Sequence, residues 1–192
     1  MKVFNGVIDP IQLNIIWIRS CIKSGEVFKK FPIGVDENDI KDLKESKRLF
    51  LSENNKMKFE SKETVALRIE VKNIPYFEIR IFEINTLNYC KTEKKNFSDD
   101  INLEGLEPKY CKMVINNEKP IVAKKVSYEF PEIKPGSNGI FVIEFVGNGL
   151  RTRAIIHKGS LGLVSEIFDH GIKVRIIDEN KDLVTGDQAG IF

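Results

Sequence analysis

An alternation of apolar and polar residues with a period of two restricts the fold of this chain most, and it begins after residue 60. Residues 65–72 alternate in this way, and residues 77–83 repeat the pattern. Successive side chains of a β-strand point to opposite faces, so the pattern predicts strands that bury one face. Asn73-Ile74-Pro75 separates the two segments, which indicates a hairpin or a corner between two sheets.

The clearest strand pair lies further along the chain. Residues 140–146 are rich in β-branched and aromatic side chains, Gly147-Asn148-Gly149 follows, and residues 151–157 return as the second arm. Small, flexible residues tolerate the positive φ that such a reversal requires. We therefore expect Gly149→Val to cost about 1–3 kcal/mol of backbone strain. The same change at Gly136, in a looser loop, is expected to cost less.

Further strands are predicted at residues 126–130, 161–168 and 172–177, with turn sequences at 135–139 and 178–181. Strands every 8 to 12 residues or so, separated by turns, are typical of an antiparallel sandwich or barrel. No helical periodicity interrupts them, which argues against a parallel α/β sheet. The expected fold is mainly β, an antiparallel β-sandwich with a short mixed N-terminal segment that contains one helix.

The first sixty residues differ from the rest. Residues 12–18 are apolar enough for a strand, and Asp36 is a candidate N-cap for a helix that runs to about Phe50. Residues 91–125 are less regular and indicate short edge strands within a long exposed excursion. Three parts are thus predicted: residues 1–60 with a strand and a helix, 61–160 as the sandwich, and 161–192 as the start of a second β unit.

Charge and hydropathy exclude several classes of protein. Thirty Lys and Arg residues balance 28 Asp and Glu residues, and charges of both signs interleave, as in residues 91–95. Nucleic-acid binders usually have a basic patch and a pI above ~9, so no nucleic-acid partner is expected. No window approaches the ~18 consecutive apolar residues of a membrane span. Residues 1–10 lack the apolar stretch of a secretory signal.

Catalytic, cofactor and metal sites are not expected. Cys111 with His157 is the one nucleophile and base that can be paired on paper, but two unrelated positions are the simpler interpretation. Residues 178–182 imitate the start of a calcium loop, yet Leu183 replaces its sharp-turn glycine. The glycine pair at 147–149 has no P-loop lysine after it, and no Cys-x-x-Cys zinc motif occurs.

The chain has three cysteines, Cys21, Cys90 and Cys111. This number is small and odd, so it does not indicate a disulfide framework. A Cys90–Cys111 bridge is one hypothesis, and buried free thiols that pack as small apolar groups are the other. Cysteine usage therefore does not identify the compartment.

Partner binding is the remaining class of site. Arg151 and Arg153 lie on one face of a predicted strand near Lys158, and we treat these three as candidate partner-binding residues, with ordinary surface as the alternative. Asn96 begins an Asn-Phe-Ser sequon and is a candidate glycosylation site. The tyrosines expected to face solvent are Tyr76, Tyr89 and Tyr110.

One family resemblance adds to these patterns. Residues 130–136, followed by the segments 139–145 and 152–156, resemble the closing strands of macroglobulin-type domains in the alpha-2-macroglobulin family. Residues 172–178 are similar to the start of the next domain in that family. The resemblance covers about residues 63–185, and it includes neither a Cys-Gly-Glu-Gln thioester nor a bait region.

The resemblance implies a structural or interaction module of a larger macroglobulin-like protein, without catalysis of its own. It would act in assembly or in partner capture, including capture of a protease. Its partners would be other proteins or neighbouring domains of the same chain, outside the cell or at its surface. The alternative is a stand-alone cytosolic adaptor that binds a peptide or an acidic partner along a strand edge.

Overall fold

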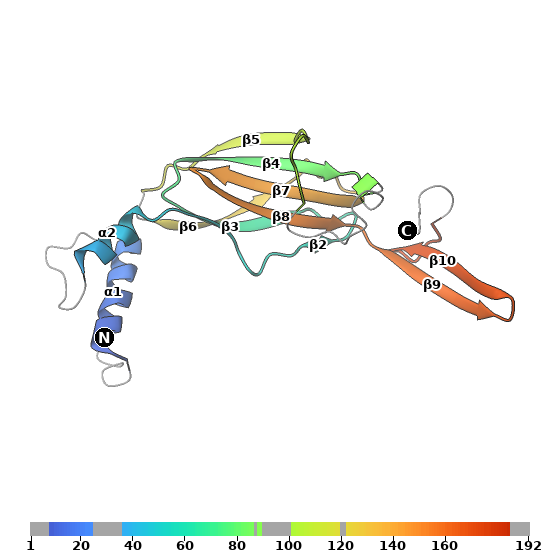
Figure 1. Cartoon of the computed structure of the whole chain (residues 1–192), viewed down its shortest axis with the longest axis horizontal. Helices are drawn as coiled ribbons and strands as arrows, with labels where there is room; N and C mark the ends of the chain where they lie inside the picture. The colour runs from blue at the N-terminus through green and yellow to red at the C-terminus, as the bar shows by residue number, and fades with distance from the viewer. Residues whose placement is uncertain (1–7, 25–35, 87, 90–100, 120–121, 185–192) are drawn as a thin grey trace.

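A computed structural model of the chain describes residues 8–24, 36–86, 88–89, 101–119 and 122–184. Two helices at one end, a β-sandwich in the middle and a projecting hairpin at the other end follow one another along the molecule (Figure 1). The helices are α1 (Pro10–Ser24) and α2 (Glu37–Glu45). The strands are β1 (Arg48–Leu51), β2 (Lys58–Phe59), β3 (Ala66–Lys72), β4 (Tyr76–Ile84), β5 (Tyr110–Ile115), β6 (Ala123–Glu129), β7 (Gly139–Gly147), β8 (Leu150–Lys158), β9 (Leu161–Phe168) and β10 (Gly171–Asp178).

Two sheets form the sandwich. One has the strand order β1-β3-β6, and all its pairs are antiparallel. The other has the order β2-β8-β7-β4-β5, in which only the short pairing of β2 with β8 is parallel. Buried apolar residues of both sheets join in one core. The predicted mainly-β, antiparallel sandwich is therefore confirmed.

The core is built from the inward-facing positions of the alternating strands. Phe145 of β7 lies at its centre without exposed surface. The centroid of its ring is 6.4 Å from those of Phe77 and Phe130 and 6.5 Å from that of Tyr128. Aromatic rings at such distances add to the stabilisation that burial alone provides. The two sheets thus meet through a cluster of four rings.

The turn between β7 and β8 has two residues, because Gly147 pairs with Leu150. Asn148 has φ +48° and Gly149 has φ +78°, as a type I′ turn requires. The predicted hairpin is confirmed. Gly136 has φ +85° as well. The expectation that Gly136→Val costs less is therefore corrected, since a side chain at either position meets the same backbone strain.

Residues 12–18 are not a strand, because they lie inside α1. A short apolar run does not distinguish a strand from a helix by its periodicity. The residues that α1 buries are Ile18, Cys21 and Ile22, and a spacing of three and four places them on one helix face. Asp9 supports the helix start, since its carboxylate accepts a hydrogen bond from the amide of Ile11 at 2.7 Å.

Asp36 is the N-cap of α2, as predicted, and its carboxylate accepts a hydrogen bond from the amide of Asn38 at 3.1 Å. The helix ends at Glu45 rather than near Phe50, because the following residues form β1. The N-terminal part thus has two helices instead of one. The sandwich also begins before the predicted boundary at residue 60, since β1 pairs with β3 and β2 pairs with β8.

The strands predicted at 161–168 and 172–177 are confirmed as the antiparallel hairpin β9–β10. After β10 the chain turns back: Leu183 bridges to Ile177, and the amide of Val184 donates to the carbonyl of Ile176 at 2.9 Å. The hairpin base is tied to the sandwich where the amide of Ser61 donates to the Glu179 carboxylate at 3.0 Å. Among the described residues, no helix is long and apolar enough to cross a membrane.

Candidate protein-binding surface on the five-stranded sheet

The outer face of the five-stranded sheet carries side chains in rows across its strands. Side chains alternate between the two faces along each strand. Residues 79, 81, 143 and 145 fill the core, so their even-numbered neighbours point away from it, to the outer face. One row contains Cys111, Arg80, Glu144 and Arg153, on β5, β4, β7 and β8. The next row contains Met113, Glu78, Val146 and Arg151.

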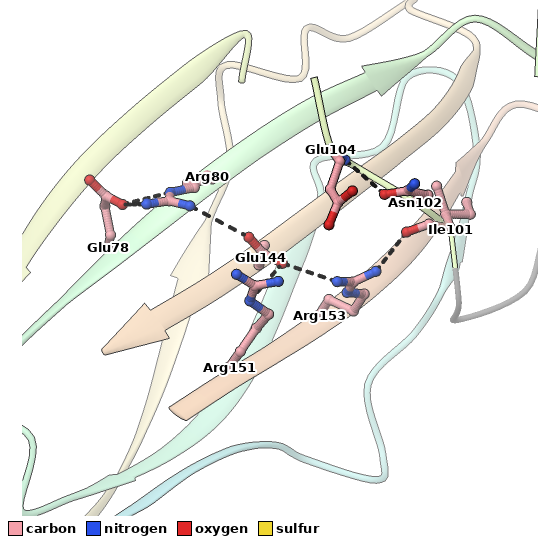
Figure 2. Close-up of polar contacts among 8 residues, drawn as sticks. All are labelled: Glu78, Arg80, Ile101, Asn102, Glu104, Glu144, Arg151 and Arg153. Atoms are coloured by element: carbon pink, nitrogen blue, oxygen red, sulfur yellow. Dashed lines mark hydrogen bonds and ion pairs between the residues drawn. The ribbon is translucent and has the colours of Figure 1, made fainter. Parts of the chain in front are cut away.

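A carboxylate with almost no exposed surface lies at the centre of the first row. Only 3% of the Glu144 side chain is exposed, and three guanidinium groups surround it (Figure 2). Its Oε1 is 3.3 Å from Nη2 of Arg153 and 3.4 Å from Nε of Arg151. Its Oε2 is 3.9 Å from Nη1 of Arg80, which is also paired with Glu78. A buried charge requires such partners, since its desolvation is otherwise costly.

Arg153 also holds a covering segment in place. Its Nη1 donates to the carbonyl of Ile101 at 2.8 Å. The Ile101 side chain is buried with outward-facing residues of β4, β7 and β8, in a second apolar cluster. A hollow of about 740 Å³ lies beside this contact, between the arginines and residues 101–104. The end of the outer face that contains Phe82, Ile140 and Ile155 is thus covered, and the end towards the β7–β8 turn carries the polar network.

The charges at the β5 side of the network change the acidity of their neighbours. The hydrogen bond from Arg80 lowers the pKa of Glu78, and the same contact raises the pKa of Arg80. Burial, and then the hydrogen bond with Glu78, raises the pKa of the Cys111 thiol. A thiol with a raised pKa is a poor nucleophile at neutral pH.

The hypothetical catalytic pair of Cys111 and His157 is not assembled. Cys111 lies on β5 and His157 on β8, so three strand spacings separate them. At about 4.8 Å per spacing, the strands alone separate them by about 14 Å. His157 also lies four residues further along β8 than Arg153, which shares a row with Cys111, so the pair is far beyond hydrogen-bond reach. The pKa of His157 is lowered by burial and then by the charge of Lys58. Within the described residues, no three His, Cys, Asp or Glu side chains are grouped to hold a metal ion.

The backbone of β5 faces an open sheet edge. The amide of Asn116 donates to the carbonyl of Pro75 at 2.7 Å, so even-numbered residues of β5 direct their backbone groups at β4. The odd-numbered residues Cys111, Met113 and Ile115 therefore direct theirs outward. In the part of the chain that the structure describes, no strand pairs with this edge.

The side chains of these odd-numbered residues are also exposed and mostly apolar. Met113 is 56% exposed and Ile115 is 73% exposed, and the exposed ring of Tyr76 lies opposite Ile115. We call Tyr76, Cys111, Met113 and Ile115 the β5 surface. Unpaired backbone groups and exposed apolar side chains occur together here, which is typical of a strand that can pair with another chain.

The sequence-predicted site residues do not form one surface. Arg151 is exposed and Arg153 is half-buried, and both contact Glu144. Lys158 is only 2% exposed, and its ammonium donates to the carbonyls of Ile133 and Lys134 at 3.1 and 2.9 Å. Burial lowers its pKa. Its expected exposure is therefore corrected: position 158 has the opposite parity to 151 and 153, so its side chain points inward.

Two of the other predicted positions lie outside the described residues, and the three tyrosines lie within them. The two outside are Asn96 and Cys90, and with Cys90 the hypothetical Cys90–Cys111 bridge. Tyr76 is exposed as expected, whereas Tyr110 is half-buried and Tyr89 packs against the second apolar cluster.

Sequence patterns did not single out β5, because its outward positions are as apolar as its inward ones.

Comparison with known proteins agrees with the architecture. Residues 77–159 match a family model described as the AbpF first immunoglobulin-like domain. Over 183 residues the chain is 31% identical to Actin-binding protein F of Dictyostelium discoideum. This alignment covers 94% of the chain. The chain spans only 8% of the length of that relative.

A solved structure of native alpha-2-macroglobulin from Escherichia coli, spanning domains MG0-NIE-MG1, is also similar. The similarity covers 70% of the chain and 46% of the solved one, with 11% identity and a TM-score of 0.45. A similarity this low carries no argument about function. The match of residues 77–159 to an immunoglobulin-like domain model supports an immunoglobulin-like β-sandwich, and the macroglobulin resemblance stays a prediction.

Proposed function

We propose that this chain is a protein-binding module of a longer protein, with its sandwich at residues 48–159 and its binding surface along β5. The observation that carries the proposal is the edge of β5, which no strand of the described residues pairs with and where outward backbone groups coincide with the exposed side chains of Met113 and Ile115. Immunoglobulin-like sandwiches serve many functions, so the site and not the fold has to support the assignment.

An extended segment of a partner fits such an edge. Main-chain hydrogen bonds to Cys111, Met113 and Ile115 would supply affinity, and alternate side chains of the partner would contact the β5 surface. Tyr76 is suited to the centre of an interface because it is large, has few rotatable bonds and carries a polar hydroxyl. Arg151 lies on β8, three strands from β5, so its exposed guanidinium would meet only a partner that extends across the outer face, where it would favour an acidic neighbour.

Actin filaments are the first partner to test. The relative that aligns with almost the whole chain is named as an actin-binding protein, although this chain corresponds to a small part of it. The proposal is that the β5 surface contributes directly to actin binding. An indirect role, in which the module only positions other domains, predicts no affinity of the isolated chain.

Co-sedimentation of the purified chain with actin filaments tests the proposal. We expect the chain to pellet with filaments, and Met113→Lys and Ile115→Lys to weaken binding by about tenfold or more, which corresponds to ~1.4 kcal/mol. Phe50→Lys is the matched control, since Phe50 is an exposed apolar residue on β1, in the other sheet. Circular dichroism would verify that all variants keep the strand content of the parent chain.

Each outcome has a separate meaning. Absence of pelleting by the parent chain would remove actin as its direct partner. Pelleting that Met113→Lys and Ile115→Lys leave unchanged would remove the β5 surface. The earlier hypotheses, protease capture in a macroglobulin-like assembly and a stand-alone cytosolic adaptor, stay predictions. The first of them requires the chain to co-elute with an active-site-blocked protease in gel filtration.

A further inference from the structure

The hairpin β9–β10 gathers aliphatic side chains on one face, and nothing in the described chain covers this apolar face. Cross-strand pairs place six aliphatic side chains on one face: Leu161, Leu163, Ile167, Ile172, Val174 and Ile176. All but Ile176 are exposed, and Ile167 most of all.

The opposite face of the hairpin is mixed, since the cross-strand pairs place Arg175, Glu166 and Lys173 on it together with the apolar side chains of Val164, Phe168 and Ile177. Arg175 and Glu166 form an ion pair across it at 3.2 Å, and Lys173 lies on the same face. A strand pair that gathers its charges on one face and presents an uninterrupted set of aliphatic side chains on the other is typical of a sheet whose aliphatic face packs on a core. A two-stranded hairpin alone is at best marginally stable in water, so the apolar face needs a covering layer.

The size of this face argues against a second copy of the chain as that layer. Six largely exposed aliphatic side chains offer on the order of 400 Å². A stable interface between separate proteins usually buries about 800 Å² on each partner. A layer supplied by the same polypeptide needs less area, because the linkage gives it an effective concentration in the millimolar range.

Further strands of the same polypeptide fit this requirement, and the chain already begins to add one. Leu183 and Val184 pair with β10 on the edge away from β9. The match to the first immunoglobulin-like domain ends at residue 159, just before the hairpin. The alignment with the much longer relative covers 94% of the chain and therefore includes most of the hairpin.

We infer that β9 and β10 are the opening strands of a second β unit, and that their apolar face packs against later strands of the same polypeptide. The proposal uses a surface distinct from the β5 surface. Its failure is therefore distinguishable from failure of the proposed partner binding, because the two are tested with different variants and different readouts.

Hydrogen exchange on two versions of the chain tests the inference: residues 1–192, and a version extended by the next 100 or so codons of its gene, about one such domain. We expect amides of β9 and β10 to exchange rapidly in the shorter chain and to slow by about 100-fold in the extended one, as burial in a folded unit produces. The amides of β7 and β8 should be protected in both, which controls for an intact sandwich.

Two substitutions in the extended chain locate the effect. Ile167→Lys, on the aliphatic face, should abolish the gained protection, whereas Val164→Lys, opposite Arg175 on the other face, should leave it. Protection of the hairpin in a monomeric shorter chain would overturn the inference, and so would a reading frame without further codons. Concentration-dependent dimers of the shorter chain that Ile167→Lys dissolves would identify a second copy as the covering layer instead.

Discussion

Arg153 on β8 lies 3.3 Å from the nearly inaccessible carboxylate of Glu144 on β7, in a directly opposed cross-strand pair. The same guanidinium reaches the carbonyl of Ile101, so one side chain connects the sheet to the segment that covers part of it. Removal of Arg153 takes away the nearest of three guanidinium groups around this buried carboxylate and also leaves the Ile101 carbonyl without this donor.

We therefore expect Arg153→Ala to lower the free energy of unfolding by about 2 kcal/mol, the size of a lost hydrogen bond to a charged group. Arg151→Ala is the matched control, since Arg151 contacts the same carboxylate from an exposed position and should contribute less than ~1 kcal/mol. Urea denaturation followed by circular dichroism measures both. Equal losses for the two variants would contradict the central position of Arg153.

The β7–β8 turn gives a second prediction, about its two glycines. An added Cβ at Gly147 would lie 2.6 Å from Cβ of Phe77 and 2.9 Å from the carbonyl oxygen of Tyr76. At Gly149 a Cβ meets no atom within 4 Å, and only the positive φ opposes it. Gly147→Ala should cost about 2–3 kcal/mol through overpacking, and Gly149→Ala about 1 kcal/mol. The reverse order in chemical denaturation would contradict the described turn.

Phe145 gives a third prediction, for the core. Phe145→Ala should lower the free energy of unfolding by about 3–5 kcal/mol, because it removes the ring on which Phe77, Tyr128 and Phe130 converge. Phe50→Ala removes an equal ring from the surface of β1 and should change stability by less than about 0.5 kcal/mol. Thermal and urea unfolding would both report the difference.

Acid should weaken the β4 side of the network, which gives a fourth prediction. The hydrogen bond from Arg80 lowers the pKa of Glu78 in the folded chain below its unfolded value of about 4.3. The contribution of Glu78 to stability is therefore fully present above that unfolded value. It is lost as the pH falls through the lowered folded pKa. The free energy of unfolding of Glu78→Gln should fall less steeply than that of the parent between pH 5 and pH 2; parallel curves would contradict the assignment.

The sequence predicted the sandwich well where alternation was strong. The two strands around Asn148-Gly149 and the hairpin β9–β10 follow directly from period-two patterns and turn residues. The apolar run inside α1 lacked such contrast, because a continuous apolar segment fits a buried strand and a helix alike. Only the spacing of Ile18 and Ile22 favours a helix.

The candidate site was harder to predict, and for two reasons. Strand parity alone would have separated Lys158 from Arg151 and Arg153, so that error was avoidable. Two other features depend on which strands become neighbours, and a single sequence does not specify that. They are the open edge of β5 and the burial of Glu144 among residues far apart in the chain.

Residue-resolved hydrogen exchange along β5, with and without actin filaments, tests the central claim most directly. In the free chain, the amides of Lys112 and Val114 should be protected, while those of Cys111, Met113 and Ile115 exchange rapidly, because only the former face β4. Bound to filaments, the three outward amides should slow by about tenfold or more as they pair with the partner. Binding that leaves these three amides as fast as in the free chain would contradict β5 as the binding edge.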